Sequence, residues 1–379
     1  MKGDKTMSWW KKYGTGCLCL LVLVSGLIIH LAMPDKALSE SERRRLDQVP
    51  SITVNRVLST EFMADVESYL QDQFPARETL RQMKAMIWYN VLQMKDNHQV
   101  YFVDGYAGKL HYPLRESAVT LFADKILSLK KMYFPQSDVY LAVIPEKNYY
   151  LAEPNGYPDL DYERMFELLD EKLTGVEISD LSALLEPSDY YRTDIHWKQE
   201  CVTDVAAYLL EWMGMETIPD YEAMEQHTID EFYGSYYGQA ALPMPADEIV
   251  YLSNDVIDHA AVQHQETGKK TGVYDLDKLT DEKSVDKYDI YLSGADALSV
   301  ITNPAVKNGK HLIVFRDSFA SSLVPLMIPA YEKITLIDLR YVSSAILGQY
   351  VDFKGKGANR PDVLFVYNTQ LINQSTILK

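Results

Sequence analysis

Apolar residues recur at helical spacing in the first part of the chain. They repeat every three or four positions over residues 62–70 and again over 80–91, which predicts two helices. Pro75 lies between these two runs and is expected to open the second helix. The segment VYFVDGY at 100–106 predicts a strand that ends at an Asp-Gly turn.

From residue 117 onward, predicted helices alternate with short apolar strands. The expected helices span residues 119–133, 162–173, 202–213, 319–330 and 342–349. The expected strands span residues 139–144, 176–181, 311–315, 334–338 and 363–367. This alternation is typical of an α/β fold in which a parallel sheet carries helices on both faces. Residues 215–300 do not show this alternation of helices and strands and are expected to form an insertion of loops and hairpins.

One apolar run, TGCLCLLVLVSGLIIHLAM at residues 15–33, is long enough to cross a bilayer as a helix. No small-x-small cleavage site with a short apolar core is evident, which favours an uncleaved signal anchor. Residues 1–14 would then be cytoplasmic and the rest of the chain extracytoplasmic. A cleaved signal peptide is the alternative. The positive-inside rule gives only weak support for this orientation, because basic residues flank both ends of the run: Lys2, Lys5, Lys11, Lys12 and Arg43–Arg45.

Composition and short motifs argue against several classes of partner and cofactor. The chain has 379 residues and a net charge of −17, which argues against nucleic acid or anionic membrane surfaces as partners. It has three cysteines, two of them in the apolar run, so a disulfide framework is not expected outside that run. Neither GxGxxG nor GxxxxGK[ST] occurs, so no nucleotide cofactor is expected.

The segment HLIVFRDSFASS, residues 311–322, places Ser318 where an apolar strand should turn into a helix. In an open parallel sheet, ligands bind beyond the carboxyl ends of the strands. Free backbone N–H groups at a helix start favour negative charge, which suits a nucleophile beside a forming oxyanion. The structural alternative is that Ser318 only caps the helix.

A second candidate is the segment YYRTDIHWKQE, residues 190–200. In an extended segment residues i and i+2 point to the same side, so Asp194 and His196 are expected to project together. A carboxylate beside an imidazole orients the ring and stabilises its charged form, and Ser318 would complete a Ser-His-Asp triad. Two alternatives remain, a histidine that stabilises a loop and a metal pair. The metal pair lacks further ligands at suitable spacing, and no metal site is expected.

Several motifs together resemble the DHHW protein family. TDIHW resembles its signature, with Ile195 in place of the first His. The other matching segments are DQFPAR, VIPEKNYY, FYGSYYGQA and FRDSFASSLVPLMIPAYEKITLIDLRYV. The resemblance covers roughly residues 40–375. These proteins are similar in turn to the SGNH-hydrolase-like O-acetyltransferases of alginate and other exopolysaccharides, which implies an SGNH-like, flavodoxin-like sheet. By this resemblance Asp194, His196 and Ser318 are the catalytic positions.

Other residues have weaker assignments. Arg316 stands where the SGNH block has Gly, and the strand PDVLFVYN resembles the one that brings an oxyanion-hole Asn, here Asn368. The backbone N–H of Ser318 is a further oxyanion donor. Arg340 and Lys147 are either substrate anchors or members of internal ion pairs. Tyr191 and Trp197 lie near the motif and offer aromatic faces that suit sugar rings.

The resemblance implies a membrane-anchored extracytoplasmic O-acetyltransferase or acetylesterase acting on cell-surface polysaccharide or glycan. The acyl group would come from a multi-spanning membrane O-acyltransferase. Residues 34–116 would form a stalk and helical lead-in, and residues 117–379 the SGNH-like domain with its insertion. The alternative is a catalytically weak or inactive carbohydrate-binding or assembly protein of the cell envelope. The feature that favours this alternative is Arg316, which stands where the SGNH block has Gly.

Overall fold

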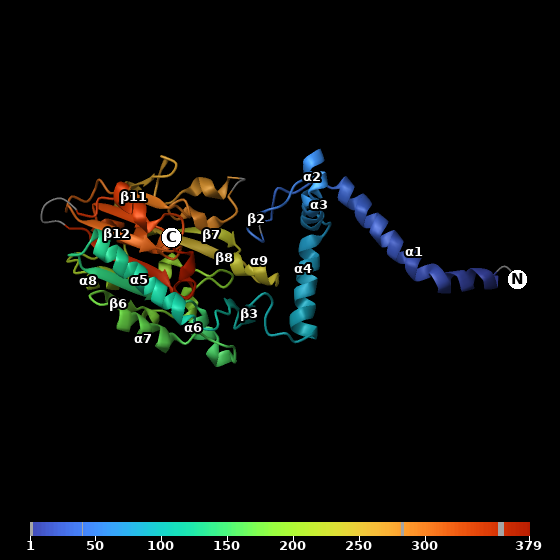
Figure 1. The fold of residues 1–379 in the computed structure, drawn as a ribbon, viewed down its shortest axis with the longest axis horizontal. Helices are drawn as coiled ribbons and strands as arrows, with labels where there is room; N and C mark the ends of the chain where they lie inside the picture. The colour runs from blue at the N-terminus through green and yellow to red at the C-terminus, as the bar shows by residue number, and fades with distance from the viewer. Residues whose placement is uncertain (1–2, 40, 282–283, 355–359) are drawn as a thin grey trace. The chain divides into compact units, whose positions relative to one another are not determined.

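The computed structural model describes residues 3–39, 41–281, 284–354 and 360–379, and Figure 1 follows them by colour along the chain. Lys2 of the basic flank lies outside these ranges. The chain divides into two compact units. The first comprises residues 1–94 with 241–243, and the second comprises residues 95–240 with 244–379.

The first unit begins with the long helix α1, Gly3–Ala32, within which Tyr13–His30 is long and apolar enough to cross a membrane. The two helices expected from the spacing are present as α3, Glu61–Asp72, and α4, Arg77–Met86. The remaining elements of this unit are β1 Leu38–Ser39, β2 Arg44–Arg45, α2 Val54–Leu58 and a π-helical turn Ile87–Val91 that continues α4.

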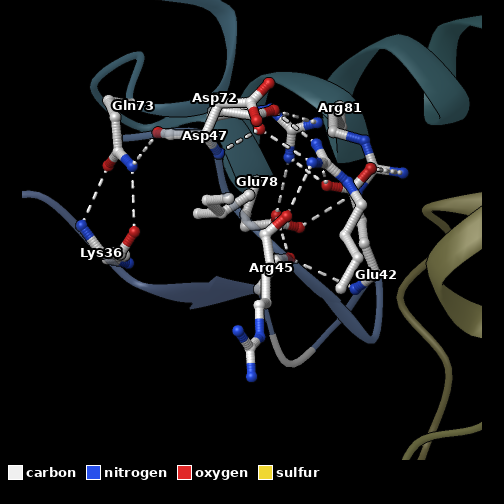
Figure 2. Close-up of polar contacts among 12 residues, drawn as sticks. Lys36, Glu42, Arg45, Asp47, Asp72, Gln73, Glu78 and Arg81 are labelled. Carbon is white, nitrogen blue, oxygen red and sulfur yellow. Dashed lines mark hydrogen bonds and ion pairs between the residues drawn. The ribbon is translucent and has the colours of Figure 1, made fainter. Parts of the chain in front are cut away.

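Charged residues tie the segment after α1 to the turn between α3 and α4, as Figure 2 shows. Glu42 accepts from Arg77 at 2.5 Å and lies 3.3 Å from a guanidinium nitrogen of Arg81. Asp72, at the end of α3, accepts from Arg44 at 2.8 Å. Burial tends to raise the pKa of Glu42, but the surrounding guanidinium groups outweigh it and the pKa is lowered. Asp72 and Arg77 of the DQFPAR motif therefore hold the lead-in together.

The second unit is built on an eight-stranded sheet of order β10-β9-β11-β13-β12-β14-β5-β6. The five strands from β13 to β6 are parallel, and they are the five that the sequence predicted. The antiparallel strands β11, β9 and β10 come from residues 215–302 and extend the sheet at one edge. The bounds are β5 Val139–Ile144, β6 Glu177–Asp180, β9 Ala261–His264, β10 Lys270–Thr271, β11 Leu298–Thr302, β12 His311–Arg316, β13 Lys333–Ile337 and β14 Asp362–Asn368.

Helices cover both faces of this sheet, because both faces of its central strands are apolar. In β5, Tyr140, Ala142 and Ile144 belong to one core cluster and the alternate residues to the other. The helices α8, Thr203–Trp212, and α11, Ala320–Met327, pack in the first cluster. The helices α5, Glu116–Tyr133, and α7, Tyr162–Lys172, pack in the second. The predicted α/β fold, a largely parallel sheet with helices on both faces, is confirmed.

The expected helix over 342–349 is a short 3-10 helix, Ser344–Gln349, rather than an α-helix. The strand expected at 100–106 is one arm of a hairpin, β3 Val100–Val103 with β4 Tyr106–Lys109. Gly105, with φ +84°, lies in its turn. The short helices α6 Asn148–Leu151 and α12 Thr369–Ile372 follow β5 and β14.

The insertion contains a long hairpin of β7, Glu225–Phe232, and β8, Asp247–Ser253, with α9, Ser235–Ala240, between the two strands. The helix α10, Asp255–Asp258, follows β8. A small core of its own joins this hairpin to the segment that contains DIHW: Tyr191, Phe232, Ile249, Tyr251, Tyr288, Ile290 and Tyr291.

Candidate active site

Ser318 lies at the corner between β12 and α11, at the carboxyl end of the parallel strands. The preceding Asp317 holds this corner with its carboxylate. It accepts the backbone N–H of Phe319 at 2.9 Å and that of Asn368, at the end of β14, at 2.7 Å. Burial raises the pKa of Asp317, and the two N–H groups oppose that rise. The neighbouring strand end is thereby joined to the serine turn.

The structure brings Ser318 to the DIHW segment. His196 Nε2 lies 2.7 Å from Ser318 Oγ, and His196 Nδ1 lies 2.5 Å from Asp194 Oδ1. Asp194 is wholly buried, and its other oxygen accepts the N–H of Ser235 at 2.6 Å. With the carboxylate at Nδ1, the neutral ring carries its proton there and can accept the serine proton at Nε2. Asp194 and His196 share one side, as the spacing predicted.

Lys147 is buried against the backbone of the segment from Tyr191 to Asp194 and does not lie at the surface. Its ammonium donates to the carbonyls of Tyr191 and Asp194, both at 2.7 Å, and its side chain is wholly buried. Burial lowers the pKa of Lys147, and the adjacent Glu146 carboxylate opposes this. These contacts favour the structural reading: Lys147 orients the backbone that carries Asp194.

Asp247, at the start of β8, holds the same segment from the other side. Its two oxygens accept the backbone N–H of Arg192 at 2.9 Å and that of Thr193 at 2.8 Å. The Thr193 hydroxyl donates to Asp247 at 2.5 Å and accepts the N–H of Gly234 at 2.9 Å. A Cβ at Gly234 would lie 2.6 Å from the Asp194 backbone nitrogen, so this close approach requires glycine.

Tyr191 and Trp197 are wholly buried, which corrects the expectation that they contact substrate. Trp197 instead joins the DIHW segment to α11. Its indole N–H donates to the carbonyl of Phe319 at 3.1 Å and lies 3.0 Å from the hydroxyl of Ser322. Tyr191 packs edge-on against Phe232, with ring centroids 5.0 Å apart. Both aromatic rings stabilise the site from inside.

Two polar candidates remain, and both, like Arg316, make hydrogen bonds within the protein. Arg340 is paired with Asp338 through two nitrogens, at 2.9 and 2.6 Å, so it belongs to an internal ion pair. The Asn368 side-chain oxygen caps α12 by accepting from Leu371 at 2.8 Å, which leaves its amide nitrogen outside that bond. Arg316 donates to the hydroxyl of Ser321 at 2.6 Å and to the carbonyl of Gly294 at 3.2 Å.

Sequence reasoning missed four residues that support the pair of Asp194 and His196. They are Gly234, Ser235, Asp247 and Tyr288, and all four come from the insertion. Gly234 and Ser235 lie in the motif FYGSYYGQA, which the sequence marks, but the sequence does not show that this motif contacts Thr193 and Asp194. No local pattern marks Asp247 or Tyr288. Among the described residues, no group of three or more His, Cys, Asp or Glu is placed to hold a metal ion.

Solved structures of two known proteins share this fold, and a third has a weaker similarity. A DHHW family protein from Eubacterium siraeum has a TM-score of 0.59 and 21% identity, over 76% of this chain and 98% of that chain. PatB1 from Bacillus cereus, solved with a sulfonyl adduct, has a TM-score of 0.56 and 17% identity, over 72% of this chain and 95% of that one. The O-acetyltransferase domain of Pseudomonas putida AlgJ has a TM-score of 0.42 and 13% identity, over 72% of this chain and 92% of that one.

No sequence among the curated proteins matches the chain. The model of the family described as DHHW protein matches residues 181–337, which include both the DIHW segment and Ser318. The resemblance to the DHHW family that the motifs indicated is therefore confirmed by the family model over these residues and by the fold shared with the Eubacterium siraeum protein.

Proposed function

We propose that this chain is a serine-dependent enzyme of the cell envelope, either an acyltransferase that acylates sugar hydroxyls or an esterase that hydrolyses their acyl esters. The observation that carries the proposal is the continuous relay from Ser318 Oγ to His196 Nε2, 2.7 Å, and from His196 Nδ1 to Asp194, 2.5 Å. The buried carboxylate orients the ring, and the half-buried serine remains accessible at the end of the sheet. Acetyl groups and polysaccharide acceptors are what the family resemblance implies.

The reaction follows from this geometry in two steps. Ser318 Oγ attacks the acyl carbonyl while His196 Nε2 takes the hydroxyl proton, and the donor's leaving oxygen or sulfur departs with that proton. A sugar hydroxyl, or water, then attacks the acyl-serine. His196 takes the proton of the acceptor and returns it to Ser318 Oγ. The acyl group ends on the sugar or on water, and the free serine is restored.

The developing oxyanion needs donors beside Ser318. Its own backbone N–H, at the turn that starts α11, is one donor that we assign. The amide nitrogen of Asn368 is the second, because the capping bond to α12 uses only the side-chain oxygen. Asp317 supports both assignments, since it fixes the backbone of Asn368 and of the serine turn.

Location determines the source of the acyl group. We propose that α1 anchors the chain, with its N-terminus in the cytoplasm and the second unit outside. Outside the cytoplasm the acyl donor would be supplied through a membrane-bound O-acyltransferase. Protease protection of the intact chain in right-side-out vesicles tests this orientation. Digestion of the second unit without permeabilisation is expected, and full protection would contradict the orientation.

The chemistry is tested with the full chain in detergent micelles. A sulfonyl fluoride should modify Ser318, seen as one adduct on the peptide that contains it, and p-nitrophenyl acetate should be hydrolysed. Ser318→Ala and His196→Ala should abolish both signals. The exposed Ser188 gives a matched control, and Ser188→Ala should change neither. A folded parent without adduct or hydrolysis would overturn the proposal, and glycan binding by that parent would favour the non-catalytic alternative.

A further inference from the structure

The insertion places one aromatic ring flat against the imidazole of the site. Tyr288 belongs to the 3-10 helix Lys287–Ile290, and its ring centroid lies 4.0 Å from that of His196 with an interplanar angle of 7°. Tyr288 is 4% exposed, so water does not compete for this face of the imidazole. The ring centroid of Phe319 lies 5.1 Å from that of the same imidazole, and the two ring planes are tilted by 60°. The imidazole is thus confined by two rings.

The hydroxyl of Tyr288 fixes the ring to the nucleophile helix. It donates to Ser322 Oγ at 2.9 Å and lies 3.3 Å from the carbonyl oxygen of Ser318. Ser322 lies one turn after Ser318, and it also receives the indole N–H of Trp197 at 3.0 Å. Tyr288 therefore contacts the histidine with its ring and the serine's own helix with its hydroxyl.

The backbone after Tyr288 is held at the same corner. Leu292, Ser293 and Gly294 have φ of +56°, +62° and +87°, a run of left-handed residues that is costly where two of them are not glycine. The carbonyl of Gly294 accepts from Arg316, the last residue of β12, at 3.2 Å. Arg316 thus connects the end of the insertion to the strand that presents Ser318.

We propose that Tyr288 is a positioning residue for the serine–histidine chemistry, holding the imidazole plane so that Nδ1 faces Asp194 and Nε2 faces Ser318. The inference rests on the proposed function. Rotation of the imidazole would break both hydrogen bonds, and a misplacement of about 1 Å can cost roughly 100-fold in rate. The stacked ring of Tyr288 opposes that rotation. The hydrogen bond from its hydroxyl to Ser322 holds the ring in place relative to α11.

Two variants separate the ring from the hydroxyl in the full chain. Tyr288→Phe keeps the stacked face, and Tyr288→Leu removes it. Tyr288→Met is a second ring-less variant, with a more flexible side chain that can fill the space if leucine impairs folding. Tyr251→Leu is the matched control. Tyr251 lies in the same small core but stacks on His227 instead of His196, with ring centroids 4.8 Å apart and an interplanar angle of 19°.

Two readouts are taken on each folded variant. The first is the second-order rate constant for modification of Ser318 by a sulfonyl fluoride. The second is the ¹H–¹⁵N resonance of the His196 Nδ1 proton shared with Asp194, in ¹⁵N-histidine-labelled protein. The ring-less variants should react about 100-fold more slowly and lose or broaden the resonance. Tyr288→Phe should react within about 3-fold of wild type, and Tyr251→Leu should leave both readouts unchanged.

The inference is overturned if a ring-less variant reacts at the wild-type rate with the resonance intact. It is equally overturned if Tyr251→Leu slows the reaction as much, because the effect would then be general packing. A wild-type chain that is not modified at Ser318 would defeat the proposed function. In that case the resonance still decides separately whether Tyr288 holds the imidazole.

Discussion

The close approach of Gly234 to Asp194 makes a sharp prediction for Gly234→Ala. An added Cβ would lie 2.6 Å from the Asp194 backbone nitrogen and nearer still to its Cα and Cβ, whereas ordinary contact begins at 3.4 Å. These are atoms of the main chain and of a wholly buried residue, so no flexible side chain can move aside. The two segments must separate by roughly 1 Å.

That separation disrupts the hydrogen bonds around the buried carboxylate. The N–H of Ser235 donates to Asp194 at 2.6 Å, and the N–H of Gly234 donates to Thr193 at 2.9 Å. Losing a hydrogen bond to a charged group costs about 1.5–3 kcal/mol. The strain of overpacking adds about 1–3 kcal/mol. The free energy of unfolding should therefore fall by roughly 2.5–6 kcal/mol.

The reaction should suffer as well, since Asp194 orients His196. Modification of Ser318 by a sulfonyl fluoride should slow by about 100-fold for a shift of 1 Å. Gly272→Ala is the control, because a Cβ at Gly272 would come no nearer than 3.6 Å to the carbonyl oxygen of Tyr274. It should leave both stability and labelling unchanged. A Gly234→Ala chain that unfolds and reacts like wild type would refute the steric reasoning.

Three further predictions follow from the contacts around the site and in the lead-in. Lys147→Met leaves the buried carbonyls of Tyr191 and Asp194 without their charged donor, so the free energy of unfolding should fall by about 3–5 kcal/mol. Denaturant titration measures this, and an unchanged midpoint would contradict the role of Lys147. Trp197→Phe keeps most of the packing but removes the indole donor to Phe319, so a smaller loss of about 1–2 kcal/mol is expected in the same titration. A loss as large as that of Lys147→Met would show that ring packing dominates. The pKa values of Glu42 and Asp72 are lowered, so their ion pairs stabilise the lead-in above the usual carboxylate pKa, and this stability is lost as the pH falls through the lowered values. Hydrogen exchange of α3 and α4 between pH 7 and pH 3 should show this loss, and Glu42→Gln should flatten the dependence; protection that stays constant with pH would contradict it.

Local pattern was sufficient for much of the second unit. Four of the five parallel strands are largely apolar runs, and β6 is a short strand of mixed polarity that follows a predicted helix. The helices between the strands repeat at helical spacing, so these elements could be assigned without tertiary information. The shared side of Asp194 and His196 follows from alternation along two residues. The position of Ser318 follows from the end of one apolar strand and the start of one helix. Each of these depends on neighbours in the sequence.

The antiparallel strands β9, β10 and β11 could not be assigned in this way. β9 has four residues and β10 two, and the polar stretches around them carry no clear period. β9 pairs with β10 nearby in the chain, but β11 pairs with β9 and β13, which are distant in the sequence, so only the folded sheet determines that these strands extend it.

The roles of single side chains near the triad depended on packing more than on pattern. Trp197 and Tyr191 looked like exposed aromatic faces, yet the insertion and α11 bury both completely. Lys147 and Arg340 were ambiguous because a charge in a sequence has no visible partner. The fold supplied the partners, backbone carbonyls for Lys147 and Asp338 for Arg340.

The sequence by itself thus determined the α/β layers, the resemblance to the DHHW family and the segments that hold an acid, an imidazole and a hydroxyl. Periodicity and short motifs record those features locally. Only the tertiary structure decided the distances among the three groups and the identity of their supports, Gly234, Asp247 and Tyr288. The physical reason is that these hydrogen bonds and ring contacts join residues distant in the sequence, such as His196 and Ser318, which are 122 positions apart, and such pairings arise only when the chain closes on itself.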